Sequence, residues 1–160
     1  MRHPFRHRPA GPAFRLWKVS AFHCLLALAA ACLPLSPARG EPLTPAGERA
    51  VRTVVRGQLD ALARDDAVKA FSFAAPNVRQ AVGSAAAFLA MVQRGYPVVY
   101  RPASVAFLKP ESEGDQAIQR VRMVDGAGDA WLAIYSLQLQ KDRSWRITGC
   151  RVVADRARMA

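Results

Sequence analysis

Hydrophobic residues between positions 43 and 95 repeat at helical spacing. The pattern begins at Thr44 and Pro45, an N-cap residue followed by a proline at the first helical position. The apolar stripe that follows consists of Val51, Val54, Val55, Leu59 and Leu62. Because this spacing places the side chains on one face of a helix, it predicts an amphipathic helix that runs to about Arg64.

Shorter helical segments are predicted to follow the first helix. Asp65 or Asp66 supplies the N-cap of a second helix, which ends at Pro76 because proline cannot continue a helix. A helical turn is expected over Asn77–Val82, and a third helix over Ser84–Arg94.

From residue 98 onward the hydrophobic period changes to two, which is typical of β-strands. Four strands are predicted, at Val98–Lys109, Gln116–Asp125, Asp129–Gln140 and Ser144–Val153. In the third of these, one face receives Trp131, Ala133, Tyr135, Leu137 and Leu139, and the other receives Ser136, Gln138 and Gln140. One apolar and one polar face predict an antiparallel meander.

Helices that come first and hairpin-linked strands that come afterwards predict an α+β domain. We expect about three N-terminal helices to pack on one face of a curved, four-stranded antiparallel sheet. The predicted domain covers residues 41–153 and is followed by a flexible tail at residues 154–160. This length fits a single domain with a modest core.

Residues 1–40 have a different composition and predict a secretory signal peptide. Residues 1–18 carry Lys and Arg but no acid, residues 19–35 are almost uninterruptedly apolar, and small residues follow up to Gly40. This is the pattern of a signal peptide, and cleavage after Gly40 would release Glu41. We therefore expect an exported protein, periplasmic or secreted, that meets a membrane only through its leader.

Three other interpretations of this segment stay open. Ser36-Pro37-Ala38 is a second cleavage motif. Cys32 could be acylated in a lipoprotein, although Ala29 stands where such a signal usually has leucine. Residues 19–35 could also remain as an uncleaved anchor, but they are fewer than the ~20 apolar residues that span a bilayer.

Removing the leader changes the charge and the available chemistry. The chain has 23 basic and 12 acidic residues, but 6 of the basic ones precede Glu41, so the remainder has 17 basic residues and a net charge of +5. This excess is spread along the chain and argues against nucleic-acid binding.

All three histidines and two of the three cysteines also lie in the leader. Nucleophilic sites that need histidine and the usual zinc sites are therefore excluded, and Cys150 alone cannot form an internal disulfide.

Three parts of the chain resemble segments of a known family. They are residues 71–76 (FSFAAP), residues 88–92 together with 95–102 (FLAMV and GYPVVYRP), and residues 139–150 (LQKDRSWRITGC). The chain resembles an exported bacterial family, the domain of unknown function 4864, over most of residues 46–153. That family has no established activity, so the resemblance implies no catalytic residue.

Helices followed by a long curved sheet are also similar to the cone-shaped fold shared by nuclear transport factor 2 and ketosteroid isomerase. The final hairpin of such domains often reads Asp-Gly-x-Trp. Here Arg143 stands where the glycine would be, so the turn must form without the residue that most easily adopts positive φ. The likeness implies a pocket inside the cone, and it implies a homodimer through the open sheet face as one option.

Aromatic residues of the sheet and of the segment before it are candidates for lining such a pocket. They are Tyr96, Tyr100, Trp131, Tyr135 and Trp145. Core packing is the alternative for each, since a small domain needs its large side chains for burial. Cys150 lies among apolar strand residues and is expected to be a small buried side chain, not a reactive thiol.

Charged residues offer two further candidates. Arg120, Arg122 and Arg146 lie on predicted strands and could form a basic patch for an acidic partner, with a solvated outer sheet face as the alternative. Asp60, on the first helix, could act as a general base if it were buried in the cone.

The sequence as a whole predicts an exported, non-enzymatic binding domain without metal or cofactor. The expected partner is a small apolar ligand inside the cone or another envelope protein. Two alternatives stay open: an isomerase- or dehydratase-like enzyme with a carboxylate or tyrosine in the cone, and an electrostatic interaction module that uses the basic sheet face.

Overall fold

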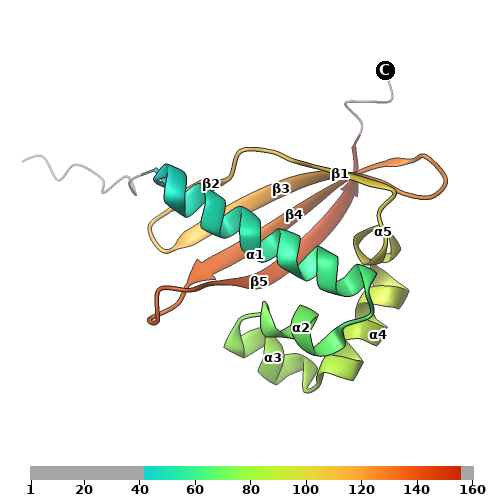
Figure 1. Cartoon of the computed structure of the whole chain (residues 1–160), viewed down its shortest axis with the longest axis horizontal. Helices are drawn as coiled ribbons and strands as arrows, with labels where there is room; N and C mark the ends of the chain where they lie inside the picture. The colour runs from blue at the N-terminus through green and yellow to red at the C-terminus, as the bar shows by residue number, and fades with distance from the viewer. Residues whose placement is uncertain (1–41, 156–160) are drawn as a thin grey trace, which may run out of the picture. The chain divides into compact units, whose positions relative to one another are not determined.

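A computed structural model describes residues 42–155, which form five helices and one antiparallel sheet of five strands (Figure 1). The helices are α1 (Pro45–Ala63), α2 (Ala67–Ser72), α3 (Pro76–Val82), α4 (Ala85–Gly95) and α5 (Pro97–Tyr100). The strands are β1 (Ser104–Phe107), β2 (Glu111–Glu113), β3 (Gln116–Val124), β4 (Ala130–Leu139) and β5 (Trp145–Ala154). The predicted leader, residues 1–40, lies outside the described residues, as does the predicted tail beyond Asp155.

Polar N-cap residues begin three of the helices. The side-chain oxygens of Thr44, Asp66 and Ser84 accept hydrogen bonds, at 2.9 to 3.1 Å, from backbone N–H groups three residues further along α1, α2 and α4. Each cap satisfies an N–H group that the first turn of a helix leaves without an internal partner. The predicted helix starts at Thr44 and Asp66 are therefore confirmed.

The sheet is built on the three long strands β3, β4 and β5. They pair antiparallel in chain order, while β1 and β2 share the other edge of β3. The chain after α2 runs beside the outer edge of β5: Ala75 N–H donates to the Ile147 carbonyl at 2.8 Å, and Ile147 N–H donates to the Phe73 carbonyl at 2.9 Å. These bonds fix the short helices next to the start of β5.

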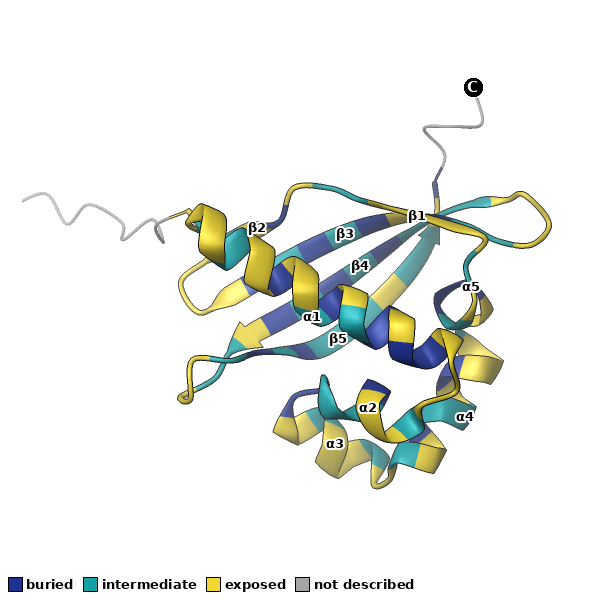
Figure 2. Cartoon of the chain, viewed as in Figure 1, coloured by how far each residue is buried: buried dark blue, intermediate teal, exposed yellow. Residues whose placement is uncertain are grey.

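One face of the sheet is covered by helices, and α1 supplies most of the cover (Figure 2). Val51, Val55 and Leu62 are fully buried on the inner face of α1, which crosses the sheet nearest to β5 and β3. On β3 and β4 the inner residues alternate along each strand. Those inner residues are Ala117, Gln119, Val121, Met123, Ala133, Tyr135 and Leu137. Each buried aliphatic side chain of this size contributes about 1.5–3 kcal/mol, so this layer is the main source of stability.

Helix α2 approaches α1 closely because Gly57 has no side chain. A Cβ atom at Gly57 would lie 2.5 Å from Cζ of Phe73, so the Phe73 ring rests directly on the α1 backbone. Beside it, the buried Gln58 donates a hydrogen bond from Nε2 to the Ala70 carbonyl at 3.2 Å. Together these two contacts hold α2 against the C-terminal half of α1.

Three predicted strands agree with β3, β4 and β5, but the first predicted strand was wrong over much of its length. Residues 98–100 of the expected strand belong to the helical turn α5, and β1 occupies only Ser104–Phe107. Pro97 takes the first helical position, and a short apolar run does not by itself distinguish a strand from a buried helical turn. The acidic segment Glu111–Glu113, expected as loop, pairs with β3 as β2. The sheet therefore has five strands, not four.

The expected number of about three helices was also too low, since α3 and α5 are helices in their own right. The predicted end of the domain, residue 153, lies within strand β5. Strand β5 ends at Ala154, and the buried Asp155 forms an ion pair with Arg122 at 3.1 Å.

The turn between β4 and β5 generates a prediction about stability. Arg143 adopts a φ of 65°, in the left-handed region that glycine enters most easily. We expect Arg143→Gly to raise the free energy of unfolding by about 1 kcal/mol, because a non-glycine residue in this region is strained by about that amount. Urea denaturation measures the change.

Lys141→Gly is the matched control for this test, because Lys141 lies in the same turn without a positive φ. It is expected to give no gain in stability. Equal effects of the two substitutions would contradict the claim that strain at Arg143 is the cause.

Candidate functional site

Helices α2 to α5 leave an apolar cavity of about 260 Å³ against the inner face of β4 and β5, which we call the inner pocket. Its residues come from the C-terminal half of α1, the segment from α2 to α5, and the two strands. They are Gln58, Leu62, Ala74, Val78, Val82, Phe88, Met91, Val92, Tyr96, Val99, Tyr135, Ile147, Gly149 and Cys150.

The inner pocket exists because the short helices do not fill the space over β5. Helix α3 has no fully buried residue, and Val78 and Val82 line the cavity without filling it. Phe71 of α2 and Phe88 of α4 pack with their ring centroids 5.5 Å apart. This aromatic pair joins α2 to α4.

Tyr135, on β4, is the most informative residue of the pocket. Its side chain is fully buried, and the described residues give its hydroxyl no partner of normal hydrogen-bond geometry: its polar neighbour is the Cys150 thiol, a weak donor and acceptor. A buried hydroxyl without such a partner costs about 1–3 kcal/mol. Unsatisfied groups of this kind are rare in folded proteins, and a bound molecule is one way to satisfy them.

Cys150, on β5, is the register partner of Tyr135 and contributes the only thiol among the described residues. Burial raises the pKa of the Cys150 thiol to about 12, although the neighbouring Tyr135 hydroxyl acts in the opposite direction. Burial also raises the pKa of Tyr135 well above its usual value, and Cys150 adds to this shift. Both groups are therefore neutral at physiological pH.

The inner pocket has no charged residue in its lining. Asp60, the carboxylate considered from the sequence, is exposed on α1 and does not line it. An anion or a cation placed in the pocket would therefore lose its hydration without gaining an opposite charge, which is strongly unfavourable. The chemistry of the pocket favours a neutral occupant.

A second, larger cavity of about 450 Å³ adjoins the turn between β3 and β4, and we call it the outer pocket. Tyr96, Trp131, Arg101 and Asp125 are among its residues. Trp131 Nε1 donates a hydrogen bond to Asp125 Oδ2 at 2.8 Å, and this bond is the main reason that the pKa of Asp125 is lowered. The outer pocket is thus more polar than the inner one.

The structure distributes the five aromatic candidates over different environments. Tyr96 and Tyr135 line the inner pocket, whereas Trp131 joins Tyr96 in the outer pocket. Trp145 is buried in the core at the start of β5. The hydroxyl of Tyr100 donates a hydrogen bond to Asp65.

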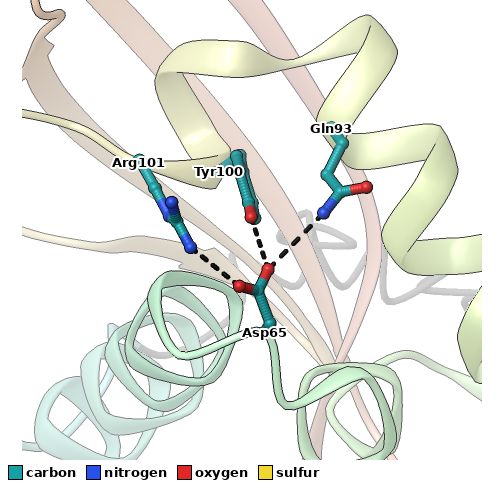
Figure 3. A network of polar contacts seen from close by, with 4 residues as sticks. All are labelled: Asp65, Gln93, Tyr100 and Arg101. Carbon is teal, nitrogen blue, oxygen red and sulfur yellow. Dashed lines mark hydrogen bonds and ion pairs between the residues drawn. The ribbon is translucent and has the colours of Figure 1, made fainter.

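Asp65 is the centre of a polar cluster that joins the end of α1 to α4 and α5 (Figure 3). Its carboxylate accepts hydrogen bonds from Tyr100, from Gln93 at 3.4 Å and from Arg101 at 2.7 Å. Asp65 holds this position with a φ of 58°, a conformation that non-glycine residues seldom adopt. Such a conformation persists where the surrounding contacts over-determine it.

Arg120, Arg122 and Arg146 lie on the uncovered face of the sheet, as the register of β3, β4 and β5 shows. Arg120 pairs with Glu111, and Arg122 pairs with Asp155. Two of the three predicted cations are therefore already neutralised by neighbouring carboxylates.

Residues 42–155 contain neither a cluster of metal ligands nor a membrane-spanning helix. No group of three or more His, Cys, Asp or Glu side chains is placed to hold a metal ion there. No helix in this part of the chain is long and apolar enough to cross a bilayer.

The fold and its pocket define a class of protein: an α+β domain with helices on one face of an open antiparallel sheet and a neutral cavity between the layers. Within that class, the chain belongs to the family described as domain of unknown function (DUF4864), whose model matches residues 45–160. No curated protein and no solved structure matches the chain.

The Tyr135 hydroxyl, whose polar neighbour is only the Cys150 thiol, leads to a prediction about stability. We expect Tyr135→Phe to raise the free energy of unfolding by about 1 kcal/mol, because the change removes a buried polar atom and keeps the ring. Chemical denaturation measures the difference. Tyr100→Phe is the matched control and should lower stability, since the Tyr100 hydroxyl donates to Asp65. Equal losses for both variants would mean that the Tyr135 hydroxyl has a partner in the folded protein.

The raised pKa of Cys150 leads to a prediction about reactivity. The thiolate is the reactive form, so a group that keeps its proton to about pH 12 reacts slowly at pH 9, the usual thiol value. We expect iodoacetamide at pH 9 to alkylate Cys150 at least about tenfold more slowly in the folded than in the guanidinium-unfolded protein. Mass spectrometry of the Cys150 peptide separates it from the leader cysteines. Similar rates in the two states would contradict a buried, protonated thiol.

Proposed function

We propose that this domain binds a small, neutral, mostly apolar molecule in the inner pocket. The observation that carries the proposal is the fully buried Tyr135 hydroxyl, which lacks a normal hydrogen-bond partner beside an apolar cavity. Apolar walls with a few polar groups are the usual composition of small-molecule sites. A ligand with one hydroxyl or carbonyl group would supply the missing partner and bury its remaining surface against Val78, Val82 and Met91.

The volume of the pocket limits the size of this ligand. A cavity of about 150 Å³ in another protein holds one benzene molecule. By the same proportion, the 260 Å³ of the inner pocket accommodates a molecule of about ten non-hydrogen atoms. An alcohol or ketone with a chain of medium length fits both the volume and the single polar anchor.

Binding is better supported than catalysis. An isomerase- or dehydratase-like reaction needs a group that accepts a proton near neutral pH. Asp60 is exposed, and burial keeps the Tyr135 hydroxyl protonated by raising its pKa. The pocket therefore offers a hydrogen-bond donor for recognition and no base among its lining residues.

We also propose that the protein is exported and that its domain is a variant of the nuclear transport factor 2-like cone. The first proposal is supported by the basic, apolar and small-residue order of residues 1–40. The second is supported by helices that precede and cover one face of an antiparallel sheet and by a cavity between the two layers. Export would place the pocket where it meets small molecules of the envelope.

A pocket-filling substitution tests the proposed function. We expect Val78→Phe to weaken binding of octanol by at least about tenfold, because the larger side chain occupies space that the ligand needs. Isothermal titration calorimetry of the full-length protein measures the affinity. Val68→Phe is the matched control: Val68 is 75% exposed on the neighbouring helix α2 and does not line the pocket.

Two results would count against the proposal. One is that the unaltered protein does not bind octanol at all. The other is that Val68→Phe and Val78→Phe weaken binding equally, which would place the ligand elsewhere on the molecule.

A further inference from the structure

We infer that Tyr96 determines the length of the ligand, because its side chain separates the inner pocket from the outer pocket. This inference rests on the proposed function and adds the residue that sets its specificity. Tyr96 is the one residue that both cavities share. Removing its ring would join the two into a longer site.

Strand β5 shows that the two pockets are neighbours. Cys150 lines the inner pocket, and Val152 lines the outer pocket. Residues two apart on a strand point to the same face and lie about 7 Å from each other. The cavities therefore follow one another along the inner face of β5, with Tyr96 at the boundary.

The other wall gives the same order. Val92 and Val99 face the inner pocket, while Gly95, Pro97 and Val98 face the outer one. These residues surround Tyr96 in the sequence at the junction of α4 and α5. The junction thus presents one side to each cavity and carries the tyrosine between them.

Tyr96 is held in place by its backbone. Its N–H donates to the Val92 carbonyl at 2.9 Å, and its own carbonyl accepts hydrogen bonds from Val99 and Tyr100. The half-buried side chain also packs against the core. The backbone bonds fix the position of the Tyr96 main chain, and the contacts with the core hold its ring between the two cavities.

The Asp65 cluster fixes the same junction from outside. The Asp65 carboxylate accepts hydrogen bonds from Gln93 of α4, which precedes Tyr96 in the chain (Figure 3). It also accepts hydrogen bonds from Tyr100 and Arg101, which follow Tyr96. One carboxylate therefore ties both sides of the Tyr96 position to the end of α1. The positive φ of Asp65 belongs to the C-terminal cap of α1, in which Asp65 N–H donates to the Leu62 carbonyl at 3.0 Å and Asp66 N–H donates to the Ala61 carbonyl at 2.9 Å.

Calorimetry with two alcohols tests the inference on the full-length chain. Octanol matches the inner pocket, whereas dodecanol has four further methylenes and exceeds it. Each newly buried methylene strengthens binding about fourfold. In Tyr96→Ala we expect dodecanol to bind at least about tenfold more tightly than octanol. In the unaltered protein and in Tyr96→Phe, which keeps the ring, we expect no such gain.

The outcomes separate this inference from the proposed function. If the unaltered protein binds octanol but Tyr96→Ala keeps the same preference for chain length, Tyr96 is not the partition. If Tyr96→Phe gains as much as Tyr96→Ala, the ring is not the barrier. If neither the unaltered protein nor Tyr96→Ala binds either alcohol, both the proposed function and the inference are overturned. Tyr96→Leu replaces Tyr96→Ala if the alanine variant does not fold.

Discussion

The structure depends on the way in which one long helix and several short ones share a single face of the sheet. The apolar stripe of α1, with Val51, Val55 and Leu62, packs across the sheet from β3 to β5 and forms most of the core. One helix is too narrow to cover the whole face of the sheet. The part of β4 and β5 beside α1 is left to the shorter helices, α3 foremost, whose side chains do not fill the space, and the inner pocket results.

The same arrangement separates the well-packed core under α1 from the proposed binding site around Tyr135. Gly57 lets the Phe73 ring lie on α1, so the C-terminal end of α2 is anchored there. Tyr135 remains beneath them with a hydroxyl that no described residue satisfies well. Phenylalanine at position 135 would fill the same volume without burying a hydroxyl group, and it would be more stable. Packing alone therefore does not account for a tyrosine at this position. The buried hydroxyl is therefore the feature that favours a role in binding.

Much of the fold could be predicted from periodicity and capping. The limits of α1, β3, β4 and β5 follow from Thr44, from the spacing of apolar residues and from the turns between strands. Residues 98–109 could not be assigned in this way, because Val98 and Val99 are apolar neighbours that suit a buried turn as well as a strand. The candidate site was predicted less fully. Tyr96 and Tyr135 were among the aromatic candidates, but only the register places Cys150 beside Tyr135.

The most direct test of the account is a crystal structure of the protein with bound octanol. The account predicts that the alcohol oxygen lies within hydrogen-bond distance of Tyr135 Oη and that the alkyl chain lies among Val78, Val82 and Met91. Octanol bound only on the uncovered face of the sheet, or an inner pocket that stays closed at saturating octanol, would contradict it.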